Sequence, residues 1–381
     1  MEKEFLNLEN NFWERHPVSF KKFKVYPVWF DSMGAKSSCI LIETPETKIL
    51  VDPGASGMQP AYPLPEEEKS KLREKALKCI KEASKRADII FISHYHYDHH
   101  FLPEEAGEVY KGKTLWIKNP NLWINLSQWK RARLFLKQLL GEKIEKIYTS
   151  KTYLPRLKDP LEDLPISSTR NYGSYQERKN ELIEKGRDWL FRLYKKWRKE
   201  PWISEKKLRK HKILFADGKS FKVGATKIKA TPPLFHGIEY DRLGWVTALV
   251  VERAGIKLLY TSDLQGPVIE DYAFWIAKER PSILILDGPS TYLLGYMLNL
   301  INLERCIKNL LYILDHTFPR VFILDHHLLR DIRYRERIDS VYRFAKRKNK
   351  KILTAAEWYK KTPLILQIKQ HLELKMKDKT V

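Results

Sequence analysis

The feature that most constrains this chain is the segment IFISHYHYDHH at 90–100, which holds four of its eleven histidines within seven positions. The apolar run ADIIFI leads into this cluster and predicts a buried strand. Imidazole rings held this close repel one another when protonated, and each neutral ring needs partners for two nitrogens. The cluster therefore predicts a bound group that the histidines share.

The spacing inside the cluster indicates what that group is. In an extended segment, residues two apart point to the same side, so His94, His96 and Asp98 share one side, and His99 follows where the chain can turn into a helix. Neutral imidazole and carboxylate are the usual ligands of Zn²⁺. We therefore expect two adjacent metal ions, one bound by the two histidines and the other by Asp98 and His99. Ordinary loop histidines are the alternative, which an aspartate at the matching offset disfavours.

The remaining pattern predicts strands and helices in two similar halves. Strands are expected at 23–30, 38–43, 47–51, 87–93, 114–118, 219–223, 226–232, 245–252, 256–262, 282–290 and 320–327, with a last one at 351–355. Helices are expected at 66–86, about 122–140, 176–200, 268–279, 302–315 and 331–348. Hairpin-rich strands followed by strand–helix alternation predict an α/β (α+β) fold in which two sheets pack face to face with helices outside. We expect one domain over residues 1–381.

A basic segment from about 130 to 212 is expected to be a helical insertion within that domain. It holds 24 Lys and Arg against 11 Asp and Glu, more than half of the chain's net charge of +23. In the helix expected at 176–200, one stripe is apolar and the opposite face is basic. The stripe is Leu182, Gly186, Trp189, Leu193 and Trp197, and the basic face includes Lys195, Lys196, Arg198 and Lys199. The two tryptophans of the stripe are expected to pack in the core.

This charge has two interpretations. A positive excess of this size attracts phosphates, whether in nucleic acid, in nucleotides or on an anionic membrane. The alternative is a lysine-rich surface of the kind found in thermophilic proteins.

Composition narrows the class of protein further. No run approaches the roughly 18 apolar residues of a membrane span, and the N-terminal segment lacks the layout of a secretory signal. The three cysteines, Cys39, Cys79 and Cys306, are far apart and odd in number, which disfavours a disulfide framework. We expect a cytoplasmic protein without a membrane partner.

The order His94-x-His96-x-Asp98-His99 after an apolar strand resembles the signature of the metallo-β-lactamase superfamily. Companion residues follow in the superfamily's order: His236 in PLFHG, Asp263 in LLYTSD, and His326 or His327 in FILDHH, with Asp52 in LVDPG before them. The phrases ISHYHYDHH, YTSDLQGP and DHHLLRD resemble more closely an uncharacterised, mainly archaeal family of predicted hydrolases in that superfamily. The resemblance covers about 23–118 and 213–357 and implies a four-layer αββα sandwich, with the basic insertion outside it.

The resemblance also implies a role for each residue. His94, His96 and His236 would form a first metal site, Asp98, His99 and a late histidine a second, and Asp263 would bridge the two ions. Asp287, which also ends an expected strand, is the rival for Asp263. For the late histidine we favour His326 over His327, because Arg330 follows it at the spacing seen in the tRNA-processing branch of the superfamily. Asp52 would support the site without binding metal.

This ligand set predicts a metal-dependent hydrolase whose nucleophile is a metal-bridging hydroxide. Zinc is favoured for the two divalent ions, with iron or manganese as alternatives. Asp98 would be the catalytic residue, because it can orient the hydroxide or move its proton. His327, His100 and Tyr97 are candidates for the proton donor to the leaving group.

The sequence is compatible with more than one class of substrate. The basic insertion favours a phosphodiester or nucleic acid. A small-molecule ester or lactone, such as the lactone of a phosphorylated sugar, is the alternative if the insertion only covers the cleft. A nucleic-acid-binding protein without activity is a third possibility, which the complete ligand set disfavours.

Overall fold

The computed structural model describes residues 12–149, 155–208 and 211–378. Most of the N-terminal segment, and residues 150–154 and 209–210 of the basic segment, therefore lie outside the described residues. The larger of two main sheets has the strand order β1-β2-β3-β4-β5-β6-β10-β9. Its strands are β1 (Val18–Phe20), β2 (Phe23–Phe30), β3 (Ser38–Glu43), β4 (Lys48–Val51), β5 (Ile89–Ile92), β6 (Thr114–Ile117), β9 (Lys206–Lys207) and β10 (Lys212–Phe215).

The second main sheet has the order β11-β12-β15-β16-β17-β18. Its strands are β11 (Ser220–Val223), β12 (Thr226–Ala230), β15 (Leu249–Arg253), β16 (Ile256–Tyr260), β17 (Ile283–Asp287) and β18 (Val321–Asp325). Both sheets begin with antiparallel strands and contain a parallel run, from β4 to β6 and on to β10 in the larger sheet and from β16 to β18 in the second. In the larger sheet, β9 at the edge is antiparallel to β10. The parallel strands β5, β17 and β18 are buried along their whole length, as expected for strands covered on both faces.

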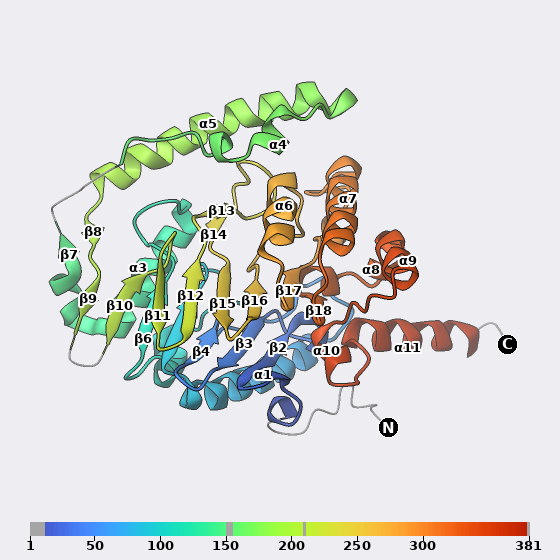
Figure 1. Ribbon diagram of the computed structural model, residues 1–381, viewed down its shortest axis with the longest axis horizontal. Helices are drawn as coiled ribbons and strands as arrows, with labels where there is room; N and C mark the ends of the chain where they lie inside the picture. The colour runs from blue at the N-terminus through green and yellow to red at the C-terminus, as the bar shows by residue number, and fades with distance from the viewer. Residues whose placement is uncertain (1–11, 150–154, 209–210, 379–381) are drawn as a thin grey trace.

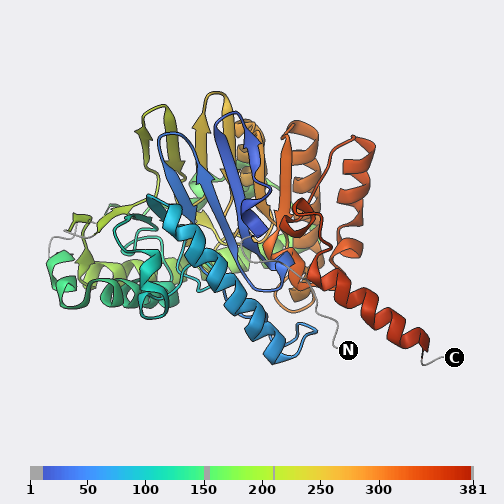
Figure 2. The ribbon, with the colours of Figure 1, turned by 90° about the horizontal axis from the view of Figure 1, so that it is seen from below.

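Helices cover the outer faces of the two sheets. The blue and the yellow-orange strands lie between α1 (Glu66–Arg86) and the orange helices (Figure 2). The helices on the second side include α6 (Glu270–Glu279), α7 (Leu300–His316), α8 (Tyr334–Arg337) and α9 (Asp339–Arg347). The expected layers, helix–sheet–sheet–helix, are therefore present. Within the described ranges, no helix combines the length and the apolar character needed to cross a membrane.

The basic segment contains the long helix α5, which runs along the top of the molecule above the small strands β13 and β14 (Figure 1). Its elements are α3 (Leu126–Leu140), β7 (Tyr148–Thr149), α4 (Pro165–Thr169), α5 (Gln176–Lys199) and β8 (Trp202–Ile203). The expected helix at 176–200 is thus confirmed. On its inner face Gly186, Leu193 and Trp197 are buried, as the stripe predicted, and Leu190 joins them while Trp189 is half-buried.

Two expectations near the C-terminus are wrong. The segment 351–355 forms only a single bridge, between Leu353 and Ile323. Thr354 instead caps α10 (Ala355–Trp358) through a reciprocal capping box with Glu357, and the backbone N–H of Ala355 donates to Asp325 at 2.8 Å. Capping thus ends the extended segment early. The helix expected at 331–348 is divided between α8 and α9, and a further helix, α11 (Leu364–Asp378), follows.

Candidate metal centre

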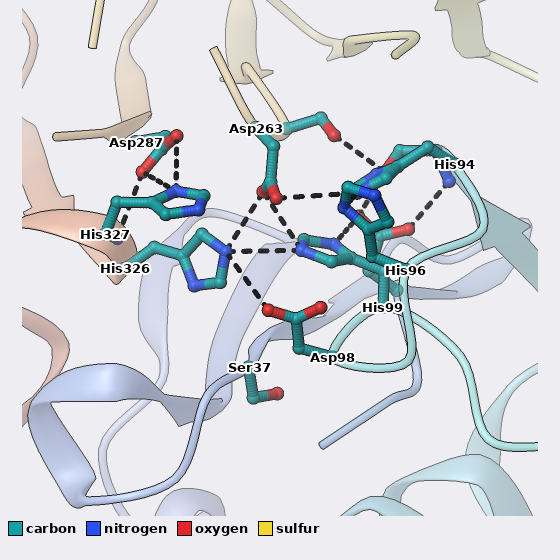
Figure 3. Close-up of polar contacts among 12 residues, drawn as sticks. Ser37, His94, His96, Asp98, His99, Asp263, Asp287, His326 and His327 are labelled. Carbon is teal, nitrogen blue, oxygen red and sulfur yellow. Dashed lines mark hydrogen bonds and ion pairs between the residues drawn. The ribbon is translucent and has the colours of Figure 1, made fainter. Parts of the chain in front are cut away.

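A single carboxylate, that of Asp263, lies between two groups of histidines (Figure 3). Its Oδ1 atom is 2.9 Å from Nε2 of His99 and 3.1 Å from Nε2 of His326. Its Oδ2 atom is 3.4 Å from Nε2 of His94 and 3.5 Å from Nε2 of His236. The two oxygens therefore face different groups, which is the arrangement expected of a carboxylate that bridges two ions.

The first group is His94, His96, His236 and Asp263, whose potential ligand atoms all lie within 4.8 Å of one another. His94 Nε2 is 3.1 Å from His96 Nδ1. Donors at the corners of a tetrahedron around zinc, with bonds of about 2.0–2.1 Å, lie roughly 3.3 Å apart. The spacing in this group matches that value. The Nδ1 atom of His94 is 3.0 Å from the Ser93 hydroxyl, which leaves Nε2 facing the group.

The second group is Asp98, His99 and His326, which also have ligand atoms within 4.8 Å. The Nε2 atoms of the two histidines are 3.2 Å apart, and His326 Nε2 is 4.0 Å from Oδ2 of Asp98. Burial opposes the charge on Asp98, yet His99 and Arg330 outweigh it and hold the pKa of this carboxyl well below its usual range. Asp98 is therefore an anion that keeps 13% of its side-chain surface exposed to solvent.

Buried polar atoms in these groups lack the hydrogen bonds that burial normally demands. Within the described residues, both ring nitrogens of His236 and both carboxylate oxygens of Asp263 form no hydrogen bond of normal geometry, although each side chain is about 1% exposed. Burial also lowers the pKa of His236 to about 3, so its ring is neutral and can bind a metal. These unsatisfied donor atoms point at one another across a gap of ligand-to-ligand size, so the residues fit a metal centre.

Asp52 lies behind the second group and contacts it through hydrogen bonds. Its carboxylate accepts hydrogen bonds from the backbone of Ser93 at 2.7 Å, the Ser93 hydroxyl at 2.6 Å, and the Tyr260 hydroxyl at 2.6 Å. His99 Nδ1 donates to the same carboxylate at 2.9 Å. Although burial alone would lower it, Asp263 and Asp52 together raise the pKa of His99 to about 10. Asp52 therefore fixes the His99 ring with Nε2 facing the centre.

Asp31 fixes the ring of His326 as Asp52 fixes that of His99. Asp31 was not identified from the sequence. Its Oδ1 atom accepts from His326 Nδ1 at 2.7 Å, and its Oδ2 atom accepts from Arg330 Nε at 2.6 Å. The other end of Arg330 donates to Asp98 at 3.1 Å. Asp31 follows directly after β2, as Asp52 follows β4, and this position at a strand end was the available signal.

The two adjacent late histidines point to different partners. His326 takes a left-handed backbone, with φ of 65°, and its ring faces His99 and Asp263. His327 Nδ1 lies 3.0 Å from both oxygens of Asp287, and its other ring nitrogen lies on the side of Asp263 (Figure 3). The carboxylate of Asp287, the alternative to Asp263, is therefore hydrogen-bonded to His327. His327 is nevertheless near enough to form a third group with Asp263 and His326.

The remaining predicted residues, His100 and Tyr97, lie at the edge of the site. His100 is buried against Tyr95 and Phe135, and its Nδ1 atom donates to the backbone oxygen of His96 at 3.0 Å. It therefore braces the loop that carries His96. Tyr97 is 39% exposed, with the guanidinium of Arg131 over its ring at 4.8 Å.

The loop that carries His236 is held by the basic segment. His236 follows β13 (Leu234–Phe235), which pairs with β14 (Trp245–Val246), and its backbone N–H donates to Gly244 at 3.0 Å. Three residues later, Glu239 is 2.7 Å from Arg305 of α7 and 3.0 Å from Lys179 of α5. The basic segment is therefore fastened to the backbone that carries His236.

Comparisons with known proteins show the family of this chain. The model of the metallo-β-lactamase superfamily matches residues 34–101. A UPF0282 protein of Korarchaeum cryptofilum is 31% identical over 349 residues, which cover 91% of this chain and 93% of the relative. A UPF0282 protein of Methanocaldococcus jannaschii is 34% identical over 327 residues, covering 83% and 88%.

Among solved structures, Zn²⁺-bound PqqB of Methylobacterium extorquens is similar with a TM-score of 0.38 and 11% identity, over 84% of this chain and 85% of that one. A structural likeness at this level is too remote to place the chain, so the assignment follows from the sequence relatives and the superfamily match. The chain belongs to the UPF0282 family of the metallo-β-lactamase superfamily.

Proposed function

We propose that this protein is a metal-dependent hydrolase that cleaves a phosphodiester bond. The observation that carries the proposal is the position of Asp263, whose two oxygens each face a separate group of neutral or metal-competent side chains. The proposed ligands are His94, His96 and His236 for one ion, Asp98, His99 and His326 for the other, and Asp263 for both. We also keep the proposal that the protein acts in the cytoplasm.

Two divalent ions bound here, zinc by preference with iron or manganese as alternatives, would lower the pKa of a shared water and polarise an oxygen of the substrate. The chain's own residues must then hold the reactants and move protons. Asp98 is anionic and partly open to solvent, and Arg330 fixes its orientation. In this proposal Asp98 orients the attacking water and accepts its proton.

His327 is the proposed proton donor to the leaving group. Burial raises the pKa of the Asp287 carboxyl well above its usual range, so this carboxyl can pass a proton to His327 Nδ1 as the second ring nitrogen, which lies toward Asp263, gives its own proton to the leaving group. His100 is directed to a backbone oxygen and packs away from the cleft, which favours His327 over it. Tyr97, on the exposed rim, remains placed to contact substrate.

A phosphodiester is favoured by the charge around the site. The excess of Lys and Arg in the insertion lies in a segment that is fastened over the His236 loop. Arg330 adds a guanidinium within 3.4 Å of His326 Nε2, beside the position that a negatively charged substrate group would take. Positive charge arranged in this way stabilises the additional negative charge of a phosphoryl transition state.

The test is a hydrolysis screen on protein loaded separately with zinc, manganese and iron. The substrates are bis(para-nitrophenyl) phosphate, para-nitrophenyl phosphate, a phosphorylated-sugar lactone and a thioester. We expect turnover of the diester, and its loss in Asp98→Ala. Turnover of the lactone or thioester alone would replace the proposal with the small-molecule alternative. No turnover of any substrate by protein with two bound ions would favour the binding protein without activity.

A further inference from the structure

A mixed polar and apolar cleft lies beneath α5, and one part of its lining begins at Ile238, two residues after His236. Its volume is about 550 Å³, within the usual range for ligand sites. It is lined by α5, by the loop 238–242 and by the loop 295–299. The first loop leaves the centre at His236, and the second follows β17, which ends at Asp287. Two walls of the cleft therefore begin at residues of the site.

The first wall is packed directly against the surroundings of the centre. A methyl group at Gly237 would lie 2.9 Å from the Asp241 carboxylate and 3.2 Å from the Gln265 side chain. The backbone of Gln265 donates to Asp287 at 2.6 Å. The second wall passes Tyr292, whose ring lies 5.9 Å from the guanidinium of Arg330. A chain-like substrate cleaved at the centre could thus continue into the cleft.

Positive charge is available inside the cleft. Lys185 and Arg242 line it, and neither side chain forms an ion pair with any residue of the described part of the chain; Arg242 lies over the ring of Trp189 at 5.3 Å. Arg178 also lines the cleft but is paired with Glu181 at 2.6 Å. Two cations are therefore free to neutralise phosphates.

The acidic groups of the cleft are largely compensated. Glu239 is paired with both Arg305 and Lys179. Asp241 accepts a hydrogen bond from the backbone of Leu243 at 2.9 Å, and burial raises the pKa of its carboxyl to about 6. These contacts leave Lys185 and Arg242 as the cations that can act on a ligand.

Apolar groups gather at the mouth of the same cleft. Tyr296 is 85% exposed and Met297 is 59% exposed, both on the loop 295–299. Tyr175 lines the cleft on the side of the insertion. An exposed aromatic ring beside unpaired cations is the combination by which proteins bind single-stranded nucleic acid, because bases stack on the ring while the cations follow the backbone.

We infer that the cleft beneath α5 binds a single-stranded nucleic acid next to the bond to be cleaved, with Lys185 and Arg242 on phosphates and Tyr296 stacked on a base. This inference rests on the proposed function and names its substrate. The basic face at Lys195 and Lys199 lies further along α5 and does not line the cleft. It therefore supplies a control of equal charge.

The experiment measures fluorescence anisotropy of a labelled single-stranded oligonucleotide, as RNA and as DNA, with the full-length protein across a salt series. Loss of two phosphate contacts in Lys185→Glu with Arg242→Glu should reduce the slope of log affinity against log salt by about 1.4. Lys195→Glu with Lys199→Glu makes the same change in net charge and should leave the slope nearly unaltered. Far-UV CD checks that both double variants fold.

A second pair of variants tests the stacking. Tyr296→Ala should weaken binding by about tenfold, the equivalent of losing one stacked base. Phe318→Ala removes an aromatic ring that is 80% exposed elsewhere and should not change affinity. Equal effects from the cleft and control variants, or no effect from the cleft variants, would overturn the inference.

The experiments distinguish failure of the inference about the cleft from failure of the proposed function. Hydrolysis of bis(para-nitrophenyl) phosphate without specific oligonucleotide binding would reject the nucleic acid and keep the hydrolase. Cleft-dependent binding without hydrolysis of any phosphodiester would support the cleft and reject the activity.

Discussion

The indole of Trp189 in α5 is stacked on that of Trp245 in β14, with ring centroids 5.4 Å apart and planes 5° from parallel. In the β13–β14 pair, Trp245 lies opposite Phe235, the residue before His236. Trp197 adds an indole N–H bond to the backbone of Ile124 at 3.1 Å. The tryptophans of the insertion thus pack inward, as the apolar stripe predicted, and connect α5 to the strand that delivers a metal-site histidine.

The close approach of α5 to the His236 loop depends on Gly186. A methyl group there would lie 2.4 Å from Cβ of Tyr240. Gly186→Ala should therefore destabilise the protein by about 1–3 kcal/mol through overpacking, despite the better helix propensity of alanine, and should speed tryptic cleavage within the insertion. Gly107→Ala is the matched control, since φ there is −59° and nothing lies within 4 Å of its Cβ position. Equal stability of the two variants in urea would contradict the prediction.

The buried ion-pair network that joins α7, α6 and the His236 loop to α5 should be sensitive to loss of Arg305. This guanidinium is 2.7 Å from Glu239 and 2.9 Å from Glu270, and all three side chains are at most 5% exposed. Arg305→Met would leave Glu239 with Lys179 and Glu270 with Arg170 as their remaining cations. We therefore expect a loss of roughly 3 kcal/mol in the free energy of unfolding, the lower end of the range for breaking a buried ion pair. Lys308→Met, on the exposed side of α7, should change it by less than about 0.5 kcal/mol. Urea unfolding of both variants is the measurement.

Metal content distinguishes Asp263 from its rival. Elemental analysis of protein purified without chelator should give two equivalents of metal, falling to one or fewer in Asp263→Asn, because one amide cannot replace a bridging carboxylate. Asp287→Asn should retain both, since Asp287 contacts His327. A variant at 263 that keeps two equivalents would remove the bridging role.

Asp98 should matter for turnover far more than for folding. Asp98→Ala should reduce activity by about 10²–10⁴, with a far-UV CD spectrum close to that of the unaltered protein. Its side chain is partly exposed and pairs with Arg330 instead of packing in the hydrophobic core. Asp188→Ala, on the exposed surface of α5, is the control and should be fully active. An active Asp98→Ala protein would exclude Asp98 from the mechanism.

Glu46 links the two main sheets, and its contribution to the stability of the folded protein should depend on pH. Its carboxylate binds both Nε and Nη2 of Arg253 at 2.8 Å, and this contact lowers the pKa of Glu46 from 4.5 to about 2. Because the folded-state pKa is the lower one, the stabilisation is present above about pH 4.5 and is lost as the pH falls toward 2. The difference in Tm between the unaltered protein and Glu46→Gln should therefore shrink over that window. A constant difference would show that the ion pair contributes nothing.

The local sequence pattern was sufficient to predict much of the secondary structure of this protein. The helix at 66–86 and the strands at 23–30 and 38–43 begin and end where their periodicity predicts, because side-chain periods of 3.6 and 2 are set within each segment. The spacing of His94, His96, Asp98 and His99 likewise indicated two adjacent metal ions, and the resemblance to the metallo-β-lactamase superfamily added His236 and Asp263 to the candidate ligands.

Only the tertiary structure decided which of two chemically equivalent residues contacts a given partner. Asp263 and Asp287 both follow parallel strands of one sheet, and only the relative positions of the strand ends bring the first between the histidine groups and the second to His327. The left-handed backbone at His326 turns two adjacent histidines toward different carboxylates. Asp31 supports His326 across 295 residues of sequence, a contact that no local period encodes, because it depends on how the two sheets pack.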